Sequence, residues 1–323
     1  MNSRDLLRST SRTFALGIER LPGILCDATT SAYLLLRVSD YLEDNEEMDA
    51  DEKVELLNLW VNILREKEKI ETLTGKLTKT PTSSPDAIVA QHAKEILLHL
   101  HTLPHDVQEI IINHVTHSTQ GMARWVKQGP NLIDENDLDD YMFEVAGRVG
   151  YLVTQLFAWY SFSIRRRLKE IMPLAREFGL ALQTVNVIRG LREDFNRGWV
   201  YIPQKFLADM GLSAEQFFDP QHRGQALKVL DRMTEKAERH LKQALTYVKA
   251  LPWWQHGIRL GCIFPLMFAI RTLAVSRNNA EVFANEAKIT RDEVKQIVLD
   301  STLWGWSNRW LDSYYKKLNV SSS

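Results

Sequence analysis

The sequence predicts an all-α protein, and three of its features support that prediction. Apolar residues recur at intervals of three and four along most of the 323 residues, which is the spacing of one helix face. No convincing run of alternating β-branched residues, which would favour a strand, interrupts this pattern. Gly, Pro, Ser and Asp gather between the apolar segments, as is typical of helix ends and turns. We therefore expect a single domain of packed helices over residues 1–323.

Three stretches break the helical pattern, and each has the composition of a turn. Residues 72–87 are rich in Thr, Ser and Pro. Residues 128–137 form a second break, in which Asp137 is the expected N-cap of the next helix. Residues 196–204 end a long helix at Gly198 and then continue as the extended segment WVYIP. Helices are expected at about 28–45, 50–70, 85–102, 105–127, 137–160, 164–196, 222–250, 257–277 and 291–317.

The composition is that of an ordinary soluble globular protein. Hydrophobic residues make up 45% and charged residues 25%, and the net charge of −1 gives no reason to expect nucleic-acid binding. Cys26 and Cys262 are too few for a disulfide framework and indicate a reducing compartment. The charged N-terminus predicts no signal peptide, and the longest apolar run, 261–270, is shorter than the ~20 residues of a membrane span. We expect a cytoplasmic protein without a transmembrane anchor. Peripheral contact with a membrane and the oligomeric state stay open.

Acidic side chains occupy one face of the expected helix over 28–45. Asp40, Glu43 and Asp44 stand at i, i+3 and i+4, so their carboxylates share that face. Arg37 precedes them by one turn. Because the preceding SAYLLL segment is strongly apolar, these acids would repel one another on a largely buried helix. Mg²⁺ would relieve the repulsion, since it binds carboxylate oxygens together with waters and substrate phosphates. The alternative is the solvated end of an amphipathic helix.

A second polar face lies on the expected helix over 164–196. Asn186, Gly190 and Asp194 follow one another at intervals of four, with Gln183 and Glu193 near the same face. Amide and carboxylate oxygens in a row form a second metal platform, although a charged surface helix end has the same composition. Two such helices facing each other across a cavity would suit a diphosphate held through bridging metals, with arginines neutralising the leaving group.

Four segments around these residues resemble the squalene/phytoene synthase family, the head-to-head prenyl synthases. SRTFALGIERLPG (11–23) resembles the family's N-terminal Ser-x-Ser/Thr-Phe segment, and AYLLLRVSDYLEDN (32–45) resembles its first aspartate-rich motif. DYMFEVAGRVG (140–150) is similar to its Tyr-x-x-x-Val-Ala-Gly-x-Val-Gly segment. QTVNVIRGLREDFNRGWVYIP (183–203) is similar to its second motif. Two later segments, 262–274 and 278–294, look more like squalene synthases than phytoene synthases.

The resemblance implies an isoprenoid (class I terpenoid) synthase helical fold whose central hydrophobic cavity binds two farnesyl diphosphates with Mg²⁺. Arg37 and Arg189 would contact diphosphate, and Tyr141 would lie near the carbocation or act in proton transfer. The basic pair Lys288 and Arg291 would help to place NADPH, with a solvated loop as the alternative. The implied metal ligands are Asp40, Glu43, Asp44, Asn186, Glu193 and Asp194. The implied substrate contacts are Ser11, Phe14, Tyr33 and Gln183, besides the two arginines.

The implied reaction is the Mg²⁺-dependent condensation of two farnesyl diphosphates, through presqualene diphosphate, to squalene, a sterol or hopanoid precursor. A hydride from NADPH would complete the second step. Two alternatives remain. One is a presqualene diphosphate, dehydrosqualene or phytoene synthase that lacks the reduction. The other is a catalytically impaired homologue that acts as an assembly factor.

Gly190 departs from the family pattern, because it occupies the place of the first aspartate of the second motif. In one interpretation the metal site is crippled. In the other, Asn186 and Asp194 still coordinate metal, and water takes the place of the missing carboxylate. A glycine would also let a metal-bound water or a diphosphate approach the backbone closely. We favour retained metal binding, because the first motif, Arg189 and Tyr141 are all present.

Two other groups of side chains receive structural interpretations. The histidines at 99, 101, 105, 114 and 117 have no partners at zinc-ligand spacing, so we expect no zinc site. Trp306 and Trp310 stand at i, i+4 on the expected last helix, and we expect them in the core. A cap over the central cavity is the alternative for the two tryptophans.

Overall fold

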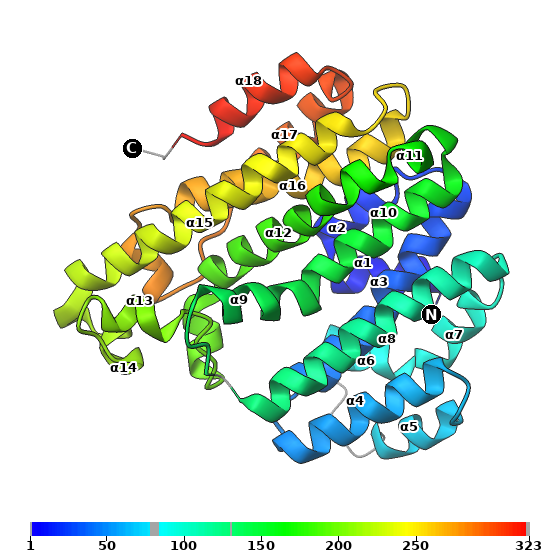
Figure 1. Ribbon diagram of the computed structural model, residues 1–323, viewed down its shortest axis with the longest axis horizontal. Coiled ribbons are helices and arrows are strands. Elements are labelled where there is room, and N and C mark those ends of the chain that lie inside the picture. Colours follow the sequence, from blue (N-terminus) through cyan, green and yellow to red (C-terminus); the bar gives the residue numbers. More distant parts are fainter. Residues whose placement is uncertain (1, 78–83, 130, 321–323) are drawn as a thin grey trace. The chain divides into compact units, whose positions relative to one another are not determined.

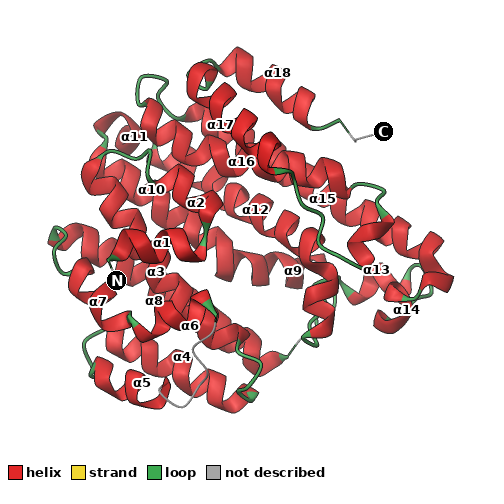
Figure 2. Ribbon diagram, turned by 180° about the vertical axis from the view of Figure 1, so that it is seen from behind, coloured by secondary structure: helices red, strands yellow, loops and turns green. Residues whose placement is uncertain are grey.

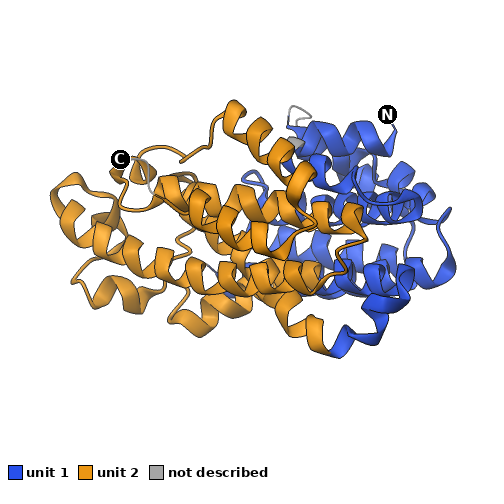
Figure 3. Cartoon of the chain, turned by 90° about the horizontal axis from the view of Figure 1, so that it is seen from above, with its two compact units in different colours: residues 1–129, 151–169 blue, residues 130–150, 170–323 orange. Residues whose placement is uncertain are grey.

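The structure is a computed structural model that describes residues 2–77, 84–129 and 131–320. Within these ranges every regular element is a helix (Figures 1 and 2). The contacts divide the chain into two compact units, residues 1–129 with 151–169 and residues 130–150 with 170–323 (Figure 3). The expectation of one domain over the whole chain stays a prediction, and the two units are described separately.

Unit 1 is built around the long helix α3. Residues Leu34 and Leu35 of α3 are fully buried, and the helix packs against α1, α4, α6, α7 and α8. A buried hydrogen bond of 2.7 Å joins the hydroxyls of Ser39 on α3 and Thr119 on α8. The helices are α1 (Ser3–Thr10), α2 (Arg12–Ile18), α3 (Gly23–Asp44), α4 (Ala50–Leu64), α5 (Ile70–Leu77), α6 (Pro85–Gln91), α7 (Ala93–Leu100), α8 (His105–Gln128), α10 (Arg148–Tyr160, from residue 151 on) and α11 (Phe162–Arg166).

Unit 2 contains the other long helices and a single π-helical turn. Its elements are α9 (Glu135–Met142), η1 (Phe143–Gly147), α12 (Leu168–Asn196, from residue 170 on), α13 (Gln204–Ala208), α14 (Ala214–Phe218), η2 (Pro220–His222), α15 (Arg223–Ala250), α16 (His256–Ser276), η3 (Ala280–Phe283), α17 (Arg291–Trp304) and α18 (Asn308–Leu318). The helix α16 packs against α15, α17 and α18.

The helix α16 is the one helix of the described residues that is long and apolar enough to cross a membrane by length and composition. Its 18-residue apolar window is 83% buried inside the structure. Phe264, Met267 and Ile270 of this helix are fully buried against its neighbours. The apolar composition of α16 is therefore accounted for by its place in the core of unit 2.

Two helices of unit 2 touch backbone to backbone, and glycines make this possible. A Cβ atom on Gly150 would lie 2.0 Å from the carbonyl oxygen of Ala175 on α12. A Cβ atom on Gly179 of α12 would lie 2.2 Å from the carbonyl oxygen of Ala146 in η1. The π-helical turn therefore lies directly on α12, and it follows Tyr141, the last residue but one of α9. Single π turns inside helices are frequent at functional sites.

Substituting Gly179→Ala should destabilise the protein by about 1–3 kcal/mol, because backbone must move to admit the new methyl group. The measurement is the free energy of unfolding in urea. Gly224→Ala, near the start of α15, is the matched control, because nothing lies within 4 Å of its Cβ position. The control should be neutral or stabilising. Equal stability of the two variants would contradict the close crossing.

A charged network joins three helices of unit 2. Lys236 on α15 is 1% exposed, and its ammonium donates to Glu135 of α9 at 3.0 Å and pairs with Asp139. One turn further along α15, Nδ1 of His240 lies 2.6 Å from the carboxylate of Glu177 on α12. A buried charge is tolerated only when such partners surround it. The network therefore fixes α9, which carries Tyr141, against α12 and α15.

Acid should weaken this network before it affects the apolar core. The hydrogen bond with His240 lowers the pKa of Glu177, and the nearby Arg176 adds to this effect while burial opposes it. A carboxyl with a lowered folded-state pKa stabilises the protein above its ordinary pKa, and that stability is lost as the pH falls through the folded value. The free energy of unfolding should therefore fall below about pH 4.3. It should fall less steeply in Glu177→Gln, and parallel curves for the two proteins would contradict this role.

The helices α3, α8, α15 and α16 lie close to their expected bounds, while several other expected bounds were wrong. The break at 72–87 begins later, because α5 continues to Leu77, and residues 78–83 lie outside the described residues. Asp134, not Asp137, caps α9, since its carboxylate accepts the backbone N–H groups of residues 136 and 137. The carboxylate of Asp137 instead accepts the N–H of Ile133.

The expected helices over 85–102, 164–196 and 291–317 are each divided in two. In the last case a tertiary contact explains the break. The guanidinium of Arg259 is fully buried and donates to the carbonyl of Gly305 and to the side chain of Asn308. Trp306 lies in the resulting turn and is 48% exposed, so its expected place in the core was wrong. Five short helices, α1, α2, α5, α13 and α14, were not expected.

Candidate active site

Unit 1 places the residues of the first acidic motif along one face of α3. Tyr33, Arg37, Asp40 and Asp44 follow one another at steps of three or four residues, so they form a stripe along the helix. The other faces of α3 pack against neighbouring helices of unit 1, where a buried polar side chain such as Ser39 has a hydrogen-bond partner. Glu43 lies beside the stripe and is 7% exposed, whereas Asp44 is exposed.

The N-terminal segment lies against the beginning of this stripe. Ser11 caps α2, its hydroxyl accepting the backbone N–H of Phe14 at 3.2 Å. The ring centroids of Phe14 and Tyr33 are 6.0 Å apart. Burial raises the pKa of Tyr33, and the charge of Arg37 and hydrogen bonds with Thr10 and Ser11 oppose that rise. The structure therefore brings Ser11, Phe14, Tyr33 and Arg37 into one group.

Arg37 is held between two carboxylates. Its Nη1 donates to Asp40 at 2.9 Å, one turn away on α3. Its Nε donates to Asp86 Oδ1 at 3.1 Å, and its Nη2 pairs with the other oxygen of Asp86. Asp86 stands in the first turn of α6, which Ser84 caps. The sequence analysis did not select Asp86, because nothing in its local pattern shows that α6 packs on α3.

The first motif fits a hard divalent cation. Burial raises the pKa of Asp40 to about 6. Asp44 and Asp86 add to this rise, and the positive charge of Arg37 opposes it. One arginine therefore does not balance the local negative charge, and the oxygens of Asp40 and Asp44 are donors of the kind that Mg²⁺ prefers. These two residues, with Glu43 at their side, would hold the ion.

Unit 2 carries the second motif on the last turns of α12. Asn186 and Glu193 are exposed, Gln183 is partly exposed, and the side chain of Asp194 is 13% exposed. One carboxylate oxygen of Asp194 is paired with Arg197 at i+3. The helix ends at Asn196, and Gly198 takes the positive φ of 81° that turns the chain away. The motif therefore ends at the turn that the sequence predicted.

Gly190 is not required by the packing of the described residues. A Cβ atom there would meet only Asp194 Oδ2, at 3.5 Å, which is ordinary van der Waals contact. By contrast, Gly179 on the same helix could not accept a Cβ atom. The carboxylate of Asp194 thus lies beside the bare backbone of Gly190. The described residues leave room for a Cβ atom at position 190, so the glycine has no structural explanation.

The second motif fits a divalent cation less well than the first. It offers the amide oxygen of Asn186, the exposed carboxylate of Glu193 and the carboxylate of Asp194, which is paired with Arg197. No carboxylate stands at position 190. These oxygens would hold Mg²⁺ only with more water or substrate oxygen in its shell.

Three aromatic rings stack in unit 2 around Tyr141. The rings of Tyr141 and Tyr201 are 4.7 Å apart and nearly parallel, and the hydroxyl of Tyr141 donates to that of Tyr201 at 3.0 Å. The ring of Trp199 is stacked with that of Tyr201, with the centroids 5.5 Å apart. The sequence analysis did not select Tyr201 or Trp199. Their spacing of two in an extended segment, which puts both on one side, was the available signal.

Glu286 connects two of the residues selected from the sequence. Its carboxylate lies 3.8 Å from Nε of Arg189 and is also paired with Lys288. The neighbouring backbone carbonyl of Phe283 accepts from Arg192 at 2.6 Å. The segment before α17 therefore lies on the arginines of the second motif. Arg291 is the first residue of α17 and is exposed, so it is not part of this group.

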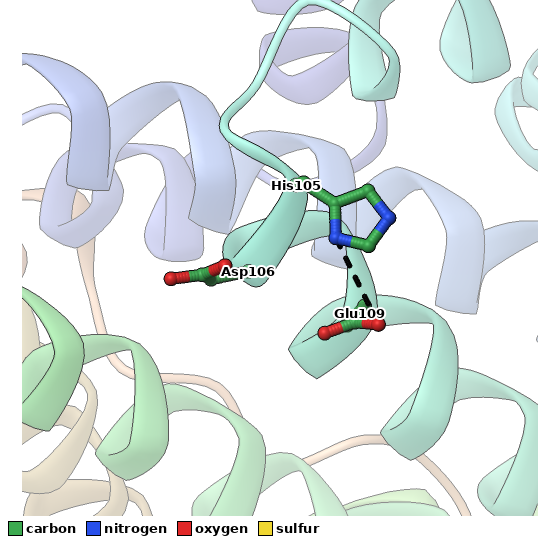
Figure 4. Close-up of side chains that lie close together, drawn as sticks. All are labelled: His105, Asp106 and Glu109. Atoms are coloured by element: carbon green, nitrogen blue, oxygen red, sulfur yellow. Dashed lines mark ion pairs between the residues drawn. The ribbon is translucent and has the colours of Figure 1, made fainter.

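A separate group in unit 1 has the composition of a metal site. Ligand atoms of His105, Asp106 and Glu109 lie within 4.8 Å of one another at the start of α8 (Figure 4). All three are exposed, and His105 Nδ1 lies 3.8 Å from Glu109. Their spacing along one helical turn brings them together without an ion. We assign no function to this group, and the expectation of no zinc site stays a prediction.

The arrangement of these residues can be compared with known proteins. A model of the squalene/phytoene synthase family matches residues 7–293. The chain belongs to this family. The squalene synthase of Rattus norvegicus is 28% identical over 296 residues, covering 92% of this chain and 68% of the relative. The squalene synthase of Saccharomyces cerevisiae is also 28% identical, over 307 residues, covering 92% of this chain and 66% of the relative.

Solved structures of squalene/phytoene synthases show the same fold. A ligand complex of TcSQS has a TM-score of 0.82 and 24% identity, covering 98% of this chain and 90% of that one. A dehydrosqualene synthase in complex with a ligand has a TM-score of 0.62 and 17% identity, covering 98% and 95%. The predicted all-α fold of the isoprenoid synthases is thereby confirmed. The roles of individual site residues stay predictions.

Gly190 is the position at which this member of the family can be given the residue of the family pattern. Because the position has room for a Cβ atom, Gly190→Asp should fold and add a carboxylate facing Asp194. We expect Mg²⁺ with pyrophosphate to raise the unfolding temperature of Gly190→Asp more than that of the unchanged protein, because the added oxygens are metal donors. The measurement is thermal unfolding with and without the two ligands.

The control for this experiment is Gly190→Ala. It should raise helix stability by about 0.5–1 kcal/mol without changing the response to Mg²⁺. A smaller Mg²⁺ response in Gly190→Asp than in Gly190→Ala would show that position 190 does not face a metal.

Proposed function

We propose that the protein is a squalene synthase-type transferase. It would join two farnesyl diphosphates head to head, through presqualene diphosphate, to squalene. Membership of the squalene/phytoene synthase family supports the reaction class. The similarity to squalene synthases over 92% of the chain supports the choice within it.

The arrangement of Arg37, Asp40 and Asp44 on α3 is the single observation that carries the proposal. A partly buried cluster of carboxylates with an arginine beside it is costly without a ligand and suits a metal–diphosphate complex. Asp40 and Asp44 would hold Mg²⁺, which would supply positive charge for the leaving group. Arg37 would donate to diphosphate oxygens as the allylic C–O bond breaks, and Arg189 is the second arginine proposed to contact diphosphate.

The first step forms a cyclopropane ring. The C1 cation of one farnesyl group is attacked by the C2–C3 double bond of the second molecule, and loss of a proton gives presqualene diphosphate and one free diphosphate. Tyr141 would stand near this cation, where the stacked faces of Tyr201 and Trp199 favour positive charge. Apolar walls would keep water from the cation.

The second step releases the other diphosphate and rearranges the carbon skeleton. The resulting cation becomes squalene when it accepts a hydride, and NADPH is the donor that the family resemblance implies. Lys288 would help to place the anionic donor. In the ligand-free structure Lys288 is paired with Glu286, so the donor would compete with that carboxylate.

Gly190 favours two alternative functions. With one carboxylate fewer in the second motif, the chain could make presqualene diphosphate, dehydrosqualene or phytoene without the reduction. It could also be a catalytically impaired homologue that acts as an assembly factor. The pairing of Asp194 with Arg197 supports these alternatives, because it uses one of the remaining oxygens.

Incubation with farnesyl diphosphate and Mg²⁺, with and without NADPH, should separate these functions by mass spectrometry of the products. We expect squalene only with NADPH, and presqualene diphosphate or unreduced C30 products without it. Asp40→Asn should lower turnover by about a hundredfold or more, because it removes charge that stabilises the leaving group. Asp27→Asn is the control, because Asp27 is also on α3 but pairs with Arg4 of α1, away from the stripe.

Presqualene diphosphate in both tubes would show a half-reaction enzyme. Turnover of geranylgeranyl diphosphate in place of farnesyl diphosphate would show a phytoene synthase. No turnover of either substrate would contradict an enzymatic function and make Gly190 the first position to examine.

A further inference from the structure

The guanidinium of Arg37 makes more contacts than the acidic motif on α3 alone supplies. Asp86 accepts from both Nε and Nη2 of the guanidinium, while Asp40 accepts from Nη1. The Arg37 and Asp86 side chains are 26% and 33% exposed, so solvent only partly screens the pair. A planar guanidinium that two oxygens hold along one edge keeps a fixed orientation.

Asp86 reaches Arg37 because of how α6 begins. Ser84 caps the helix, its hydroxyl accepting the N–H of Ala87 at 3.1 Å, and Pro85 is the first helical residue. Asp86 then stands in the first turn, and α6 packs against α3. The position of the carboxylate is therefore set by a helix end and a helix–helix contact, rather than by a loop.

The two carboxylates around Arg37 would separate once ligands bind. Asp40 is a residue that would hold metal, so a bound cation draws its oxygens away from Nη1. Asp86 stands outside the acidic motif and contacts the opposite edge of the guanidinium, formed by Nε and Nη2. With Asp86 still in place, the edge at Nη1 would be available to a diphosphate oxygen without a change in the orientation of the side chain.

We propose that Asp86 is a positioning residue that orients Arg37 toward the diphosphate of the substrate. The proposal rests on the proposed function, because it takes a prenyl diphosphate as the ligand of Arg37. Asp86 itself contacts neither substrate nor metal in this role. It acts through the bidentate pair with Arg37.

The test compares Asp86→Ala, Asp86→Asn and Asp86→Glu with the unchanged protein. We expect Asp86→Ala to raise the KM for farnesyl diphosphate and lower kcat/KM by about ten- to a hundredfold, which is the range for losing hydrogen bonds to a charged group. Asp86→Asn keeps one acceptor oxygen, so its KM and kcat/KM should lie between those of Asp86→Ala and those of the unchanged protein. Asp86→Glu restores a carboxylate and should recover part of the loss. The Mg²⁺ concentration for half-maximal activity should not change.

Asp27→Ala is the matched control. It removes the partner of Arg4, 3.2 Å away, from another arginine–aspartate pair of unit 1 that involves α3. It should leave KM and kcat unchanged. Thermal unfolding of all variants shows whether a loss of activity follows from a loss of folded protein, and Asp86→Asn, which keeps the shape of the side chain, serves where Asp86→Ala fails to fold.

A double-mutant cycle with Arg37→Ala gives the readout that a merely structural role would not produce. If Asp86 acts through Arg37, Asp86→Ala should cause no further loss when Arg37 is already absent. The same loss in both backgrounds would overturn the proposal, and so would a lower KM in Asp86→Ala, which would show that Asp86 competes with the diphosphate. A changed Mg²⁺ requirement would instead show a metal ligand.

Pyrophosphate binding in the presence of Mg²⁺, followed by the shift in unfolding temperature, separates this proposal from the proposed function. If the unchanged protein neither binds pyrophosphate nor turns over prenyl diphosphates, the proposed function fails and the role of Asp86 fails with it. If the unchanged protein does both and Asp86→Ala matches it, only the positioning role is overturned.

Discussion

The cost of placing negative charge on a largely buried helix is the constraint on which the candidate site depends. Other helices of unit 1 pack around α3, and Tyr33, Arg37, Asp40 and Asp44 form a stripe along it. Asp40 and Asp44 on that stripe raise each other's cost of ionisation, and Arg37 offsets only part of it. Asp86 accepts from two further nitrogens of Arg37, Nε and Nη2. These ordered side chains therefore carry more negative than positive charge. A metal–diphosphate ligand would bring the positive charge that is missing.

Unit 2 meets a different constraint, which is the close approach of two backbones. Gly150 and Gly179 let η1 and the start of α10 lie directly on α12, and the network around Lys236 holds α9 in place. These contacts fix Tyr141 and its stack with Tyr201 relative to the second motif within the unit. The two kinds of glycine on α12 are therefore different. Gly179 is needed for packing, whereas a Cβ atom at Gly190 would make only ordinary van der Waals contact. The departure at Gly190 therefore concerns the chemistry of the second motif rather than the fold.

Local sequence signals predicted most of the helices but located their ends less well. Long amphipathic segments such as α3, α8 and α15 were predicted because their apolar period is sustained over several turns. The predicted helix ends were wrong where a distant side chain donates to a backbone carbonyl, or where a neighbouring acidic residue caps the helix instead. Arg259 breaks the last predicted helix at Gly305, and Asp134 caps α9 in place of Asp137. The same limit applied to Trp306, whose spacing predicted a helical core residue, although it lies exposed in a turn.

By itself, the sequence determined the all-α class, the family, and the two motifs with their arginines and carboxylates. It could do so because each motif lies on one helix, where spacing of three and four decides which side chains share a face. Only the tertiary structure decided which residues from other helices join them. Asp86 beside Arg37, Tyr201 beside Tyr141, and Glu286 beside Arg189 are separated from their partners by tens of residues. Such pairs form through helix packing, and the period of a single helix contains no information about which partner it packs against.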